Sequence, residues 1–152
     1  MPNTILPVPH YPQDSVGECL AVCALMVLRY KNNLLSLKKL RKLLGVEWFG
    51  TGFANIRKLE EVGCSVEIGY GSLTELYAHI EQRNPVIVGV DTSELAYSPV
   101  DTKHAVVVMG LRDDTIYVHD PMITNTVPVA SHVDEFALAW MAHFEMYAVI
   151  TR

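Results

Sequence analysis

Two patterns of hydrophobic positions divide the chain into halves. Up to about residue 82, apolar residues recur three or four positions apart, which is the spacing of one buried helix face. Beyond that point they form short continuous runs rich in Val and Ile, as in strands buried on both faces. The chain therefore predicts helices first and strands later, which is typical of an α+β fold with an antiparallel sheet.

The helical half contains predicted helices with recognisable ends. A proline-rich stretch precedes the first of them and stays extended, because proline is excluded from helix interiors. Ser36 is placed to cap the second helix, which stops at Gly45. Ser72 and Glu75 fit a capping box at the start of the fourth. We expect helices over about 18–30, 37–44, 52–62 and 73–82, with a short strand over 64–68.

The strand half is built around two apolar runs, 85–91 and 104–111. A turn at 112–114 follows the second run, and 115–119 is its predicted hairpin partner. The stretch 94–102 between the two runs shows neither the helical nor the strand spacing of apolar residues and is predicted to be a loop. Further along we expect a strand at 126–129, a helix capped by Ser131 that ends near 141, and a last strand at 145–151.

Composition and charge exclude several classes of protein. Half of the 152 residues are hydrophobic and only 19% are charged, which excludes disorder and suits one domain, 1–152, with a full core. The net charge is -5, and the one basic cluster fits a solvated helix face, so nucleic acid is not an expected partner. The first ten residues have no basic start or apolar segment, and no run is long enough to cross a membrane. We expect a cytoplasmic protein. The basic cluster consists of Lys38, Lys39, Arg41 and Lys42.

The cysteine count leaves sulfur available for chemistry. There are three cysteines, Cys19, Cys23 and Cys64, and no two are spaced as C-x-x-C. His79, His132 and His143 show no metal-ligand spacing and are expected on helix or loop surfaces. His10 is expected in a loop that lines the cleft. We therefore expect no disulfide framework, no metal and no cofactor. In a reducing compartment the cysteines are free thiols.

Cys19 lies at the predicted start of the first helix, where N–H groups and the helix dipole favour a thiolate. A cysteine nucleophile also needs a proton acceptor and a donor for the oxyanion. His104 begins a buried strand and Asp120 ends its hairpin partner, so we expect them at one edge of the sheet as base and orienting carboxylate. Side chains alternate along a strand, which directs Asp120 toward His104 and His119 away. Gln13, in the extended stretch, can fold back to donate its amide.

These residues carry a resemblance to a known family. The segment Gln13-Asp-Ser-Val-Gly-Glu-Cys19, continued by Leu-Ala-Val-Cys23-Ala-Leu-Met26, resembles the active-site helix of the bacteriocin-processing cysteine peptidases. Those enzymes cleave leader peptides after a double glycine. The similarity continues in the apolar run that follows Lys103-His104 and in Val118-His-Asp120-Pro121. Gly50-Thr51-Gly52 fits the glycine and hydroxyl residue with which the family often opens its third helix.

The resemblance implies a papain-like fold in which the cysteine helix packs across the sheet that carries histidine and aspartate. It implies that Cys19 is the nucleophile, His104 the general base, Asp120 its partner and Gln13 the oxyanion-hole donor. The expected partner is a peptide or protein substrate, with a leader peptide as the particular candidate.

The sequence departs from the family pattern in two ways. Leu20 stands where the family usually has a glycine after the cysteine, which leaves the shape of the cleft and the double-glycine specificity open. Many members of the family are fused to a membrane-spanning exporter, and this chain contains none. An association with an exporter is therefore an expectation from the resemblance alone.

Each feature also has a purely structural interpretation. A buried cysteine near a helix start is commonly a small core residue. We interpret Cys23, one helical turn after Cys19, as a core residue and Cys64, at the start of a strand, as structural. Asp120-Pro121 is also a common way to end a strand and begin a turn. The combination of Gln13, Cys19, His104 and Asp120 favours a thiol peptidase. The alternatives are a peptide-binding module, as in relatives that lack the cysteine, and an acyltransferase or transglutaminase-like enzyme that uses the same triad.

Overall fold

The computed structural model of the protein describes residues 3–15, 17–48, 50–98 and 103–151. Within these residues, seven strands form one sheet in which every neighbouring pair is antiparallel, as predicted. The order across the sheet is β2-β7-β3-β4-β5-β6, and β1 pairs with the far end of β4. The strands are β1 (Thr4–Ile5), β2 (Val66–Tyr70), β3 (Val86–Asp91), β4 (Lys103–Arg112), β5 (Thr115–His119), β6 (Val129–His132) and β7 (Met146–Ile150).

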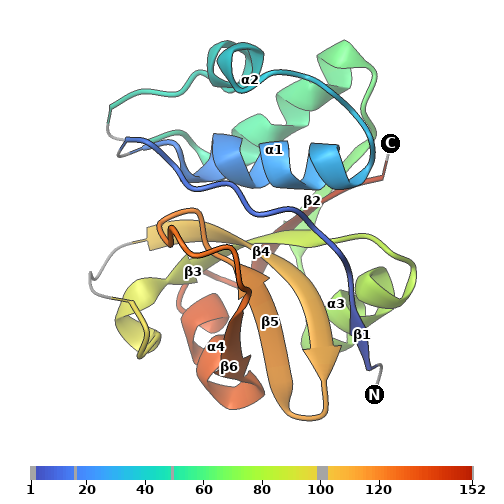
Figure 1. Ribbon diagram of the computed structural model, residues 1–152, viewed down its shortest axis with the longest axis vertical. Coiled ribbons are helices and arrows are strands. Elements are labelled where there is room, and N and C mark those ends of the chain that lie inside the picture. Colours follow the sequence, from blue (N-terminus) through green and yellow to red (C-terminus); the bar gives the residue numbers. More distant parts are fainter. Residues whose placement is uncertain (1–2, 16, 49, 99–102, 152) are drawn as a thin grey trace.

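The helices cover the sheet from two sides. Figure 1 shows α1, α2 and η1 gathered on one side of the strands, with α3 and α4 on the other. The extended N-terminal segment runs from β1 across the sheet to the start of α1 (Figure 1). The helices are α1 (Cys19–Tyr30), α2 (Leu37–Leu44), α3 (Leu73–Glu81) and α4 (Val133–Met141), with 3-10 helices η1 (Phe53–Val62) and η2 (Thr92–Glu94).

The first helix, α1, is the centre of the core. Every residue from 20 to 28 is buried, and α1 contacts β4 on one side and α2 and η1 on the others. A helix that is apolar all round must be enclosed by other elements, and α1 is. Its burial fixes the place of its first residue, Cys19, relative to β4.

The second and third helices form where the sequence predicts them. Ser36 accepts a hydrogen bond from the Lys39 N–H, and Gly45 ends α2 in the left-handed conformation. The third helix is a 3-10 helix, with Ile56 and Leu59 buried. The apolar positions Phe53, Ile56 and Leu59 are three apart, and a helix with three residues per turn places them on one face.

The hairpin of β4 and β5 sets the position of the polar residues at its open end. Val108 pairs with Val118 and Val107 with His119. Continuing this register places Asp120 opposite Val106, on the same face as His104, because alternate residues of a strand share a face. The hairpin therefore carries His104 and Asp120 together and directs His119 to the opposite face.

Several boundaries differ from the prediction. The strand expected at 126–129 forms at Val129–His132, after Pro128, which cannot donate to a strand ladder. As a result Ser131 is buried within β6, and His132, not Ser131, caps α4 by accepting from the Asp134 N–H. Cys64 precedes β2 and bonds back to η1 through its N–H and the Leu59 carbonyl. Residues 99–102 of the predicted loop lie outside the described part of the chain.

β1 was not predicted, because two residues carry no periodicity. In the described residues, no helix has the length and apolar character needed to cross a bilayer.

Candidate active site

Cys19 is the first residue of α1 and is partly exposed, whereas Cys23 and Cys64 are buried. Burial disfavours the charged form of Cys19, but its hydrogen bond with His104 and the charge of that ring outweigh burial and lower the pKa of the thiol. The N–H groups of Ala105 and Leu20 add to this effect. Burial raises the pKa of Cys23 and of Cys64. Of the three thiols, Cys19 is thus the one whose pKa the fold lowers.

His104 is the link between the thiol and the carboxylate. Its Nε2 lies 2.6 Å from Oδ1 of Asp120, and both side chains are almost fully buried. Since Nε2 bonds to Asp120, Nδ1 is the ring nitrogen left for Cys19. Burial alone would lower the pKa of His104, but the hydrogen bonds to Asp120 and Cys19 raise it to about 9. The geometry therefore favours a thiolate beside an imidazolium.

Asp120 is held by two other donors. The Tyr97 hydroxyl donates to Oδ2 at 2.8 Å, and the Met122 N–H donates to Oδ1 at 2.9 Å. Burial raises the pKa of this carboxyl, but the hydrogen bond and charge of His104 and these two donors together lower it. Tyr97 follows η2 in a stretch with no periodicity and was not predicted to be part of the site. No local signal could have found it, since it meets Asp120 only through the fold.

His119 lies on the other face of β5, as the alternation predicts. Its Nε2 is 2.8 Å from the Val8 carbonyl, and burial lowers the pKa of its ring. His10, a neighbour of Val8, packs its ring 4.8 Å from that of His119 and lies 2.5 Å from the Ile123 carbonyl through Nε2. His10 does not line the cleft at Cys19.

Gln13 reaches the site because the N-terminal segment is tied to the residues after β5. The Gln13 N–H donates to the Pro121 carbonyl at 2.7 Å, next to Asp120. Its side-chain Nε2 donates to the Ser15 carbonyl at 3.0 Å, and Oε1 is buried without a hydrogen-bond partner among the described residues. The amide nitrogen has a second N–H that this bond does not use.

A cleft of about 590 Å³ opens at these side chains. Gln13, Cys19 and His104 line it together with the turn Gly50-Thr51-Gly52. Leu20 also borders the cleft, but it is only 2% exposed, so most of its bulk packs into the core.

His143, which was expected on the surface, is a second residue of the cleft that the sequence pattern did not predict. It follows α4, lines this cleft and packs against Gly89 of β3. In the described part of the chain, no group of three or more His, Cys, Asp or Glu side chains is arranged to hold a metal ion.

The fold and the site define a class: a papain-like domain whose cysteine helix lies against a sheet that carries histidine and aspartate. The profile of the Peptidase_C39 like family matches residues 5–145. The protein therefore belongs to the Peptidase_C39 like family, a family of peptidases, as the resemblance predicted. A comparison with curated proteins gives no match.

Solved structures share the fold along almost the whole chain. A protein from Bacillus anthracis described as a C39-like peptidase has a TM-score of 0.83 at 16% identity, with 100% of this chain and 98% of the other covered. The double glycine motif protease of an AMS/PCAT transporter, solved with its leader peptide, gives 0.74 at 20% identity, covering 96% and 92%. The peptidase domain of Streptococcus ComA, an ABC transporter in a quorum-sensing pathway, gives 0.76 at 17% identity, covering 94% and 97%. At these identities the likeness shows the papain-like fold.

Proposed function

We propose that the protein is a cysteine peptidase in which Cys19, His104, Asp120 and Gln13 carry the reaction. The observation that supports this most is that Cys19 and His104 line one cleft and that His104 is bonded to the buried Asp120 at 2.6 Å. The His104 ring also lowers the pKa of the Cys19 thiol. A nucleophile, a base in contact with it and a group that orients the base are the parts of a covalent peptidase site.

The first half of the reaction transfers the acyl group to sulfur. The Cys19 thiolate attacks the carbonyl carbon of the scissile bond, and the carbonyl oxygen takes up the negative charge. The free N–H of the Gln13 amide and the N–H groups at the start of α1 stabilise this oxyanion. The C–N bond then breaks, the His104 imidazolium gives its proton to the departing amine, and a thioester remains on Cys19.

The second half returns the enzyme to its starting state. Neutral His104 takes a proton from a water molecule, which attacks the thioester carbon. The C–S bond breaks, the carboxylic acid product leaves, and Cys19 is again a thiolate beside the imidazolium. Asp120 keeps the ring in one orientation throughout and stabilises its positive charge.

The proposed substrate is an extended peptide that is cleaved after a double glycine, as in a leader peptide. Support comes from the family and from the fold shared with a double glycine motif protease that was solved with its leader peptide. Gln13 and Gly50-Thr51-Gly52 line the cleft in which this peptide would lie. A cytoplasmic location and association with an exporter are part of this proposal, as is the assignment of residues 1–152 to one peptidase domain.

The test is cleavage of two synthetic peptides that differ only in having Gly-Gly or Ala-Ala before the expected cleavage site, followed by mass spectrometry. We expect cleavage after the second glycine, no cleavage by Cys19→Ala, and turnover about 10²-fold lower in Gln13→Ala, the usual loss for one oxyanion donor. Binding of the peptide without cleavage by the parent protein would instead show a binding module. Transfer of the acyl group to an added amine in preference to water would show a transferase.

A further inference from the structure

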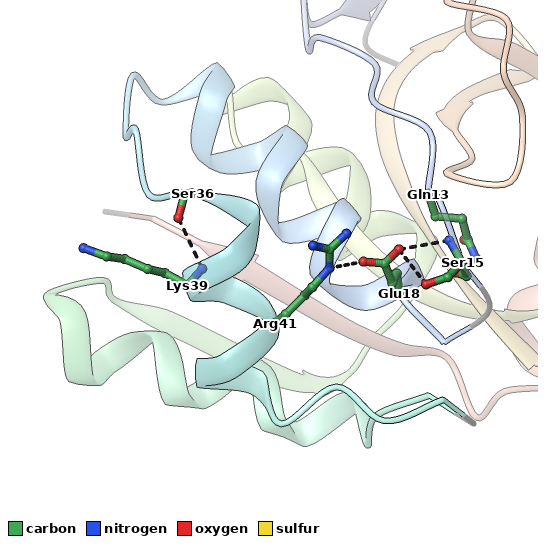
Figure 2. A network of polar contacts seen from close by, with 6 residues as sticks. All are labelled: Gln13, Ser15, Glu18, Ser36, Lys39 and Arg41. Atoms are coloured by element: carbon green, nitrogen blue, oxygen red, sulfur yellow. Dashed lines mark hydrogen bonds and ion pairs between the residues drawn. The ribbon is translucent and has the colours of Figure 1, made fainter.

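Glu18, the residue before the nucleophile, is a buried carboxylate with an unusual set of contacts. Its side chain is 3% exposed, and it forms no capping bond with α1 although it is the N-cap residue. Oε1 accepts from the Ser15 N–H at 3.0 Å and from the Ser15 hydroxyl at 2.8 Å. Oε2 pairs with Nε of Arg41 on α2. Figure 2 shows Glu18 between Arg41 and Ser15, with Gln13 beside Ser15.

These contacts continue to the amide of Gln13. The Ser15 carbonyl is the acceptor for Gln13 Nε2, and Ser15 itself is held by two bonds to Glu18. Arg41 in turn holds the carboxylate from α2, which is anchored in the core by Leu40 and Leu44. A rigid helix is thereby connected through Glu18 and Ser15 to the side chain proposed to meet the oxyanion.

We propose that Glu18 is a positioning residue, which orients the Gln13 amide through Ser15 while Arg41 holds the Glu18 carboxylate in place. This inference rests on the proposed function, because Gln13 has a role only if an oxyanion forms at Cys19. A displacement of about 1 Å in a positioned group can cost on the order of 10²-fold in rate, so such a support has a measurable effect.

Arg41 also explains how a carboxylate is tolerated next to a thiolate. An unpaired negative charge one residue from Cys19 would oppose ionisation of the thiol. Burial raises the pKa of Glu18, but Arg41 and Ser15 together lower it, so the group is a carboxylate paired with a cation. Arg41, predicted as part of a solvated basic face, thus has a structural partner.

The test uses two reagents on Cys19 to distinguish a loss of oxyanion stabilisation from a loss of thiolate reactivity. Acylation by p-nitrophenyl acetate passes through a tetrahedral oxyanion, whereas alkylation by iodoacetamide at a saturated carbon does not. We expect acylation to fall about 10²-fold in Gln13→Ala and about 10-fold in Glu18→Ala, with alkylation unchanged in both. The double variant should acylate at nearly the rate of Gln13→Ala alone, because Glu18 acts through Gln13.

A matched control and two milder variants complete the test. Glu60→Ala removes a carboxylate from the exposed pair with Arg57 and should change neither rate. Glu18→Gln keeps an oxygen that can accept from Ser15 and should recover most of the acylation lost in Glu18→Ala. If Glu18→Ala does not fold, Ser15→Ala takes its place: it removes the hydroxyl that donates to Glu18 Oε1 and, combined with Gln13→Ala, gives the same kind of comparison.

Three results would overturn the inference. The first is a double variant in which the two fold-losses of acylation rate multiply. The second is an alkylation rate that falls as much as the acylation rate in Glu18→Ala. The third is a Glu18→Gln protein that is acylated as slowly as Glu18→Ala. Failure of the proposed function is seen separately, as a parent protein that reacts with both reagents and cleaves no peptide.

Discussion

Asp120 and His119 are adjacent in the chain, but their side chains lie on opposite faces and bond to different partners. Asp120 accepts from His104, Tyr97 and the Met122 N–H, and none of these bonds involves His119. His119 instead bonds to the Val8 carbonyl and contacts His10. A carboxylate in this place fixes the orientation of the imidazole and stabilises its charge, whereas His119 supports the N-terminal segment.

Replacing Asp120 is therefore expected to slow the enzyme far more than replacing His119. Asp120→Asn removes the charge that faces the imidazolium and should lower kcat by about 10²-fold. That is less than the loss of about 10⁴-fold in a serine triad, because the thiolate–imidazolium pair is charged before attack. His119→Gln retains a donor for the Val8 carbonyl and should keep kcat close to that of the parent. Steady-state turnover of both variants, with Cys19→Ala as the inactive reference, checks this; an inactive His119→Gln would contradict it.

At the scale of elements, the loop before α1 is fitted to the turn that precedes η1. Gly17 has φ +93°, and a Cβ there would lie 2.5 Å from the Glu47 carbonyl oxygen and 2.8 Å from the Gly50 N–H. Glu47 and Gly50 form a bridge with a hydrogen bond in each direction. The Thr51 hydroxyl secures the following residues by donating to the Leu44 carbonyl at 2.8 Å. One wall of the cleft thus rests on the loop that leads to Cys19.

Gly17→Ala should consequently damage both stability and activity. Gly63 is a matched control, because it has φ +90° and nothing within 4 Å of the Cβ position. Gly63→Ala should cost about 1–2 kcal/mol for its left-handed backbone alone. Gly17→Ala adds a clash with backbone atoms and should cost more, and it alone should lower kcat/KM. Denaturant unfolding and steady-state kinetics measure the two effects; equal losses of stability in the two variants would show that the contact with 47–50 is unimportant.

At the scale of the whole molecule, the charges of the site come from three separate parts of the chain. Cys19 lies on α1, His104 on β4 and Asp120 after β5, and the packing of α1 against β4 brings them together. Burial works against both charges of the thiolate–imidazolium pair, and the mutual hydrogen bond and Asp120 outweigh it. The pH range of activity is therefore a property of the folded molecule.

We expect kcat/KM to follow a bell-shaped pH profile. The acidic limb reports formation of the thiolate, whose pKa is lowered from the ordinary 9.0. The alkaline limb reports loss of the imidazolium proton at a pKa of about 9. Above that pH the thiolate persists, so alkylation of Cys19 by iodoacetamide should stay fast while peptide cleavage declines. If alkylation and cleavage declined together at alkaline pH, the alkaline limb would not report the loss of the His104 proton.

Much of the fold follows from local chemistry that can be recognised in the sequence. The ends of α2 and α3 form where Ser36, Gly45 and Ser72 predict them, since capping and the left-handed backbone depend on a few adjacent residues. The apolar runs become β3 and β4, and the turn at 112–114 pairs β4 with β5. The errors lie where Pro128 shifts β6 and where β1 is too short to leave a pattern.

The sequence by itself determined the helices with their caps, the antiparallel strands and the order of Gln13, Cys19, His104 and Asp120, which carries the family resemblance. Only the tertiary structure decided that Tyr97 meets Asp120, that Arg41 meets Glu18 and that His143 lines the cleft. The physical reason is the separation along the chain of the residues that interact. Caps, turns and strand alternation are set by residues within about four positions, whereas each of these contacts depends on how elements far apart in the chain pack.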